Sequence, residues 1–195
     1  AVWGPGDLYS LLATGKETNN AFFTFEAIVP KGGGPPPHVH SREDESFYIV
    51  SGSLEILLGD KTYQAKRGDF VYIARGTIHQ FKNVGRDLAV QLVTFVPAGM
   101  EQFFQEVFPE VKDRNVAPPP VTEELIKRLN EAAPKYGLEF VPPPDALLGG
   151  SPASTLLRAE VKAGPSLPPE PVVNHSPSDA QPGQRIEHGE RLETV

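Results

Sequence analysis

The 195-residue sequence predicts an all-β fold, either a jelly roll or a small β-barrel, from three observations. Short apolar runs, several with alternating polarity, recur about every ten residues between residues 21 and 96. Gly, Asp and Asn separate these runs, as is typical of tight turns. Helical spacing becomes clear only after residue 97, so strands do not alternate with helices as they would in an α/β fold.

The first clear strand is predicted at residues 21–29, AFFTFEAIV, after an apolar stretch at 7–13. Its phenylalanines Phe23 and Phe25 share one face, whereas Glu26 lies on the other. The following GGGPPP segment ends the strand, because proline cannot donate a ladder hydrogen bond. Further strands are predicted at 45–50, 54–58, 62–66, 70–74, from residue 79 onward, and at 88–96.

The chain after residue 97 has a different character, with two segments of helical spacing at 99–108 and 122–137. Thr122 is a candidate N-cap of the second segment, and Gly137 is a candidate stop. Beyond residue 141 the sequence is rich in Pro, Gly and Ser, with one strand-like run at 155–162. We therefore expect three parts: a β-barrel at 1–97, a helical extension at 98–141 and an extended Pro/Gly-rich tail at 142–195.

Composition and charge narrow the possible partners. A net charge of -7 without a basic cluster argues against a nucleic-acid or anionic-membrane surface. No apolar run approaches the roughly 18 residues that a membrane span needs. The chain has no Cys, which excludes disulfides, thiolate-bound zinc and cysteine nucleophiles. We expect a small-molecule partner and a cytoplasmic location.

A candidate metal site lies in the segment 32–52, GGGPPPHVHSREDESFYIVSG. In an extended strand, residues two apart point to the same face, so His38 and His40 project side by side. Glu45 follows five residues later. Two imidazoles and a carboxylate form three corners of a site for a divalent metal, and a fourth ligand must come from elsewhere.

This segment and a second one at 68–83, GDFVYIARGTIHQFKN, closely resemble the two signature motifs of the cupin superfamily. The resemblance spans about residues 7–97 and implies a cupin-type jelly-roll β-barrel. It also implies one divalent transition metal, Fe, Mn, Ni or Zn, held by His38, His40, Glu45 and His79. One position departs from the motif: Ala74 stands where the family usually has Pro.

The acidic cluster at 43–45 leaves a choice of carboxylate ligand. Glu43 and Asp44 compete with Glu45, but only Glu45 has both the motif's spacing to Gly52 and the inward parity of Phe47. By resemblance, Glu45 is also the candidate catalytic base. The other reading of these residues is that each His is simply a satisfied polar residue of a strand.

Strand parity predicts an aromatic pocket around the metal. Residues that share the inward faces with the ligands are candidates for its lining: Phe23, Phe25, Phe47 and Phe81. The alternative is that these rings only fill the barrel core. Met100, Phe103 and Phe104 are candidates for a cover at the mouth. An apolar pocket without fixed cations favours an aromatic substrate over a sugar phosphate.

Within the superfamily, the chain looks most like the single-domain quercetin 2,3-dioxygenase-like group. This resemblance implies that the metal binds a deprotonated flavonol, that O2 adds, and that the central ring opens with loss of carbon monoxide. Two alternatives remain: a non-catalytic cupin that binds a metal or small molecule, and an O2-independent lyase or isomerase. The family also leads us to expect a homodimer.

Overall fold

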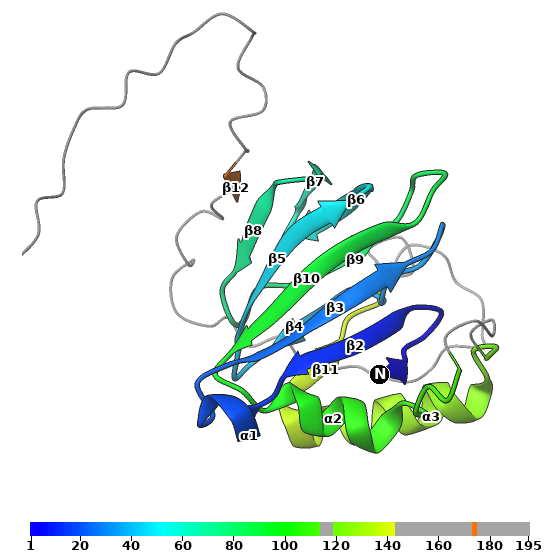
Figure 1. Ribbon diagram of the computed structural model, residues 1–195. Coiled ribbons are helices and arrows are strands. Elements are labelled where there is room, and N and C mark those ends of the chain that lie inside the picture. The colour runs from blue at the N-terminus through cyan, green and yellow to red at the C-terminus, as the bar shows by residue number, and fades with distance from the viewer. Residues whose placement is uncertain (114–118, 143–172, 175–195) are drawn as a thin grey trace, which may run out of the picture.

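A computed structural model describes residues 1–113, 119–142 and 173–174, and it contains two antiparallel β-sheets that face each other (Figure 1). The first sheet has seven strands, in the spatial order β1 (Val2–Trp3), β2 (Leu8–Ala13), β3 (Phe23–Val29), β10 (Ala89–Val96), β5 (Asp44–Ser51), β8 (Phe70–Ile73) and β12 (Val173–Asn174). The second has five, in the order β11 (Leu138–Phe140), β4 (His38–His40), β9 (His79–Lys82), β6 (Ser53–Leu58) and β7 (Lys61–Lys66). This arrangement confirms the predicted all-β jelly-roll class.

Alternating side chains of the two sheets form the core between them. In β3 every second residue is buried, from Phe23 to Val29, as the sequence alternation predicted. Phe23 stacks on Phe25 and on Phe95 of β10, with ring centroids 5.4 and 5.9 Å apart. Full burial of such a side chain stabilises the fold by about 1.5–3 kcal/mol, so this aromatic group is a main support of the barrel.

Gly34, four residues before the candidate ligand His38, allows the chain to pass close to β9. Gly34 has φ +125°, and a Cβ there would lie 2.1 Å from the carbonyl oxygen of Phe81. Only glycine permits this close approach of the GGGPPP segment to β9. The predicted stiff approach to His38 is therefore also a tightly packed one.

In the described part of the chain, four helical segments accompany the sheets: α1 (Gly15–Thr18), α2 (Met100–Val107), α3 (Glu123–Ala132) and the 3-10 helix η1 (Ala133–Tyr136). Figure 1 shows α2 and α3 together beside β2 and β11. Thr122 caps α3 as predicted, with its hydroxyl accepting from the Leu125 amide at 3.2 Å. No helix within residues 1–113 or 119–142 has the length and apolar character that crossing a membrane requires.

The structure differs from the sequence prediction in several elements. The second predicted helix is α3 followed by η1, because Pro134 lacks an amide hydrogen, and Gly137 with φ 72° ends it. The sequence prediction missed the strands β1, β11 and β12 and the helix α1, and it gave the segment of β2 only as an apolar stretch at 7–13. Two of these strands, β11 and β12, come from beyond residue 97 and join the sheets. The strand predicted at 155–162 lies outside the described residues.

Candidate metal centre and its cavity

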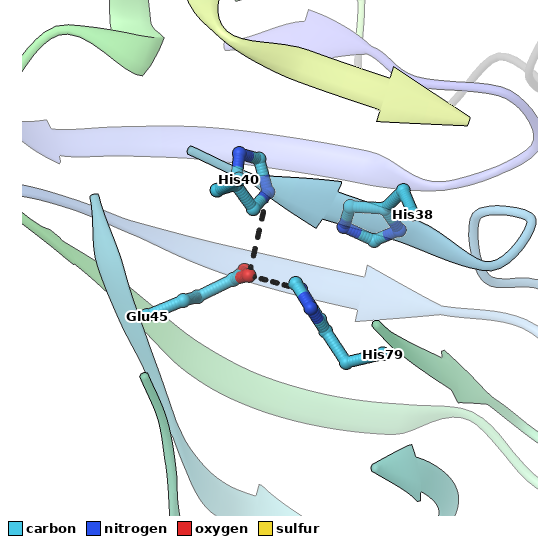
Figure 2. A group of neighbouring side chains, drawn as sticks. All are labelled: His38, His40, Glu45 and His79. Carbon is cyan, nitrogen blue, oxygen red and sulfur yellow. Dashed lines mark hydrogen bonds and ion pairs between the residues drawn. The ribbon is translucent and has the colours of Figure 1, made fainter. Parts of the chain in front are cut away.

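Three strands bring the four predicted ligands together inside the barrel. His38 and His40 lie on β4, Glu45 on β5 and His79 on β9. His38 pairs directly with His79 across β4 and β9, so the register of these strands sets the position of both rings. All four side chains are buried, and Figure 2 shows them converging on one point. We call His38, His40, Glu45 and His79 the tetrad.

The tetrad atoms are close enough to share one ion. Glu45 Oε2 lies 2.6 Å from His79 Nε2 and 3.5 Å from His40 Nε2, the two contacts drawn in Figure 2. One ligand atom from each residue lies within 4.8 Å of every other. A metal with bonds of about 2.0–2.2 Å can therefore be reached by all four after small side-chain movements.

Backbone carbonyls set the tautomers of two of the imidazoles. His38 Nδ1 donates to Pro36 O and His79 Nδ1 donates to Thr77 O, each at 2.9 Å. A carbonyl can only accept, so both rings carry their hydrogen on Nδ1 and turn Nε2 toward the tetrad. This is the arrangement by which proteins orient metal-binding histidines.

Burial keeps the β4 imidazoles neutral. It lowers the pKa of His40 to about 3, with a further contribution from the nearby His79. Burial also lowers the pKa of His38 well below its usual range, and His79 and His40 add to the effect. Metal ligands must be unprotonated, so both rings are ready to bind at neutral pH without losing a proton.

The tetrad fits a divalent metal for two reasons. Neither ring nitrogen of His40 has a hydrogen-bond partner in the described part of the chain, although both are buried. His79 Nε2 and Glu45 Oε2 face each other at 2.6 Å, and His79 Nδ1 is already paired with Thr77 O. A cation held between these atoms would be bound by His79 Nε2 and the Glu45 carboxylate, and it would give the buried ring of His40 a partner as well.

The two neighbouring acids do not belong to the tetrad. Asp44 faces outward and forms a two-pronged ion pair with Arg75, at 3.0 and 3.1 Å, which holds the pKa of Asp44 below its usual range. Glu43 is buried away from the tetrad, and this burial raises its pKa to about 7. Among the three consecutive acids, only Glu45 belongs to the tetrad.

Hydrogen bonds hold the turn that leads to His79. Ala74 stands where the motif usually has Pro, yet its carbonyl accepts from the Thr77 amide at 3.1 Å. The Gly76 amide donates to His40 O at 2.7 Å, and the Arg75 amide donates to Asp44 Oδ1 at 2.9 Å. The turn is thus tied to both ligand-bearing strands β4 and β5 without a proline.

A cavity of about 350 Å³ leads from the tetrad to the surface. Three tetrad residues line it: His38, His40 and Glu45. Among the described residues, the rest of its lining is almost entirely apolar and includes no Lys or Arg: Pro5, Tyr9, Phe25, Pro35, Pro36, Phe81, Phe95, Met100, Phe103, Phe104, Phe108, Val121, Ile126, Leu129, Asn130, Leu138 and Phe140. Such a site suits an aromatic molecule better than a charged one.

The structure separates the four predicted pocket phenylalanines. Phe25 and Phe81 line the cavity, whereas Phe23 and Phe47 do not. The last two are fully buried and fill the space between the sheets, Phe47 against Phe81 with ring centroids 5.5 Å apart. Strand parity shows which side chains point inward but not whether they reach an open space.

The helical extension contributes more of the cavity than the sequence predicted. Met100, Phe103 and Phe104, which we expected at the mouth, form part of its wall from α2. The segment of α3 was expected at the edge or mouth of the barrel and lies there, whereas the strand β11 was not expected. Phe140 of β11 lies 6.4 Å from His38 between ring centroids, and β11 pairs directly with β4. Its only sequence signal is the short LEF run after Gly137.

Tyr9 and Asp7 were also missed. Tyr9 lines the cavity from β2, and its hydroxyl donates to Asp7 Oδ2 at 3.2 Å. Burial raises the pKa of Asp7 to about 7, an effect that the Tyr9 hydroxyl and the Gly34 amide partly offset. The alternating DLYSLLA run shows a polar residue and an aromatic residue of equal parity, which was the available signal.

Comparison with known proteins agrees with this geometry. Residues 25–96, which carry the whole tetrad, match the family described as Cupin domain. The chain contains a cupin domain. This confirms the resemblance found in its two motifs.

Two curated relatives of this cupin are dioxygenases. Quercetin 2,3-dioxygenase of Bacillus subtilis (strain 168) is 27% identical over 133 residues, which cover 68% of this chain and 39% of that protein. Quercetin 2,3-dioxygenase of Aspergillus japonicus is 26% identical over 189 residues, 88% of this chain and 54% of that protein. The cupin described here thus spans about half the length of these relatives or less.

Solved structures include further similar chains. KdgF from Halomonas sp. matches 51% of this chain and 86% of its own, with a TM-score of 0.46 and 21% identity. A predicted oxalate decarboxylase from Thermotoga maritima matches 47% of this chain and 80% of its own, with a TM-score of 0.45 and 23% identity.

Proposed function

We propose that this cupin is a metal-dependent dioxygenase that acts with O2 on a flavonol-like or other aromatic, apolar small molecule. The observation that carries this proposal is the apolar cavity that ends at three tetrad residues. An aromatic molecule can enter it without desolvating a lysine or arginine, and its oxygen atoms then meet the polar end. The distant likeness to two quercetin 2,3-dioxygenases supports the same substrate class.

Different residues of the site would have different roles in this reaction. A divalent metal held by the tetrad would supply Lewis acidity, which lowers the pKa of the substrate hydroxyl. Glu45 lines the cavity and is the carboxylate placed to accept that proton. The backbone bonds of His38 and His79 hold these two rings in place. The aromatic walls exclude water from the reacting molecule.

Oxygen uptake by metal-loaded protein tests the proposal. The purified chain would be stripped of metal, reloaded separately with Fe, Mn, Ni, Co or Zn, and given a panel of flavonols in an oxygen electrode. We expect one metal form to consume O2 and flavonol in equal amounts and to release carbon monoxide. Absence of uptake with every metal would contradict the dioxygenase.

Two other outcomes would favour the alternatives. Tight flavonol binding without uptake would indicate a non-catalytic binding cupin, and turnover in anaerobic buffer would indicate a lyase or isomerase. His79→Ala serves as the site variant, and Gln64→Ala, at an exposed position of β7, serves as its control. The homodimer and the cytoplasmic location stay predictions.

A further inference from the structure

One face of α3 forms the wall of the cavity at its mouth. Ile126, Leu129 and Asn130 all line the cavity, and their spacing of three and four residues places them on the same side of the helix. Leu129 is buried and anchors this face, whereas Ile126 and Asn130 are exposed at the opening. A ligand that fills the cavity from the tetrad outward therefore ends against this part of α3.

Outside the tetrad, the side chain of Asn130 is the polar group of this lining that has no partner in the described part of the chain. The other polar lining residues are Tyr9, whose hydroxyl donates to Asp7, and the tetrad residues His38, His40 and Glu45. Asn130 makes no hydrogen bond within the described ranges of the chain. An amide offers two donors and one acceptor, so it can pair with a hydroxyl in either direction.

We infer that Asn130 is a specificity-determining residue that binds a polar group, such as a ring hydroxyl, at the end of an aromatic ligand remote from the tetrad. This inference rests on the proposed function, because it takes the tetrad as the other anchor of the ligand. An apolar cavity between two polar ends selects molecules with oxygen atoms at both ends. Because Asn130 is exposed, its hydrogen bond contributes modestly, about three- to tenfold in affinity.

The test compares two flavonols that share the same metal-chelating group. Quercetin carries hydroxyls on its outer rings, whereas 3-hydroxyflavone carries none. Their dissociation constants would be measured by absorbance titration of the metal-loaded full chain without O2, so that no turnover occurs. Asn130→Leu keeps the size of the side chain, removes its hydrogen bonds and favours the helix. Glu131→Leu changes a neighbouring α3 residue that does not line the cavity, and it is the matched control.

We expect Asn130→Leu to weaken quercetin binding about three- to tenfold and to leave 3-hydroxyflavone within twofold, since only quercetin loses a hydrogen bond. Glu131→Leu should change neither. Equal effects of Asn130→Leu on both ligands, or no effect on either, would overturn the role of Asn130 while leaving the proposed function intact. Failure of the wild-type protein to bind either flavonol would overturn the proposed function and this inference with it.

Discussion

The two ends of the cavity differ in the part of the chain that builds them. The deep end consists of tetrad residues on β4 and β5, within the segment 25–96 that matches the cupin family. Much of the mouth comes from α2, α3 and β11, which lie outside that segment. The deep end is polar, buried and held by backbone hydrogen bonds, whereas the mouth is partly exposed and apolar apart from Asn130. If the proposed function holds, the metal centre and the ligand-selecting mouth can therefore change independently in this protein.

The largest effect is expected when a metal-binding side chain is removed from the deep end of the cavity. His79→Ala deletes the ring that contacts Glu45, and we expect metal affinity to fall by more than the roughly 100-fold that loss of a supporting group causes. The barrel should stay folded, because the apolar core is untouched. Metal content by mass spectrometry, with circular dichroism for the fold, measures this.

The control for that variant is Lys82→Ala, which changes an exposed residue of the same strand. It should bind metal like the wild type. If His79→Ala retains a full equivalent of metal, the tetrad is not the metal site and the deep end has been assigned wrongly.

The second prediction concerns Asp7, which accepts a hydrogen bond from Tyr9 in the wall of the cavity. Burial raises its pKa in the folded protein from 3.8 to about 7, so the folded state holds its proton more tightly than the unfolded state. Asp7 therefore lowers stability as pH rises from about 4 to 7, by up to about 4 kcal/mol. Asp7→Asn should remove this part of the pH dependence, as urea unfolding of metal-free protein at several pH values would show.

Other groups titrate in the same window, so the difference between the two proteins is the quantity to measure. Glu43, with its raised pKa, acts in the same direction as Asp7. His38 and His40, with lowered pKa values, act in the opposite direction, because stability is lost as pH falls and the unfolded rings take up protons. Parallel pH curves for wild type and Asp7→Asn would show that Asp7 does not titrate as stated.

The third prediction sharpens the comparison at the mouth. Leu129→Ala removes the buried anchor of α3, and we expect a loss of about 2–3 kcal/mol in the free energy of unfolding. Metal stoichiometry should not change, because α3 contributes no tetrad residue. Urea unfolding and metal analysis test both halves, with exposed Lys127→Ala on the same helix as the control. Loss of metal from Leu129→Ala would show that the ends are not independent.

The smallest effect is expected beside the deep end, at the ion pair between Asp44 and Arg75. These side chains are 24% and 50% exposed, so water screens their attraction. Asp44→Asn should cost less than about 1 kcal/mol of stability. It should also leave metal affinity within about tenfold, although Asp44 is adjacent in sequence to Glu45. Calorimetric metal titration checks this, and a larger loss would mean that the outer pair sets the ligand geometry.

Sequence reasoning succeeded where short-range rules decide the structure. The parity of His38 and His40 on one strand, and the barrel that contains them, follow from alternation and turn spacing along a continuous stretch. Periodicity did not bring His79 together with His38 and Glu45. That prediction came from the resemblance of the two segments to the cupin motifs. The short helix α1 carries a capping box, Thr14 with Glu17, which was visible in the sequence and not used.

The mouth was harder to predict because it depends on contacts between segments far apart in the chain. The LEF strand β11 is three residues long, and only its pairing with β4 makes it part of a sheet. Phe23 and Phe47 have the same inward parity as Phe25 and Phe81, so alternation cannot tell which pair meets the cavity. Asn130 lies on α3, where the apolar positions Leu125 and Leu129 indicate the inward face of the helix. That pattern does not show which cavity the face meets.

The pairing of β11 with β4 means that the segment between β10 and β11 is held at each end by a strand of a sheet. This segment leaves the seven-stranded sheet at Val96 and returns to the five-stranded sheet at Leu138, which pairs with His40. Both of its attachment points are regular strands, and neither requires a change in the tetrad. Replacing residues 98–137 with the corresponding segment of another cupin would therefore change the mouth of the cavity and leave the tetrad as it is.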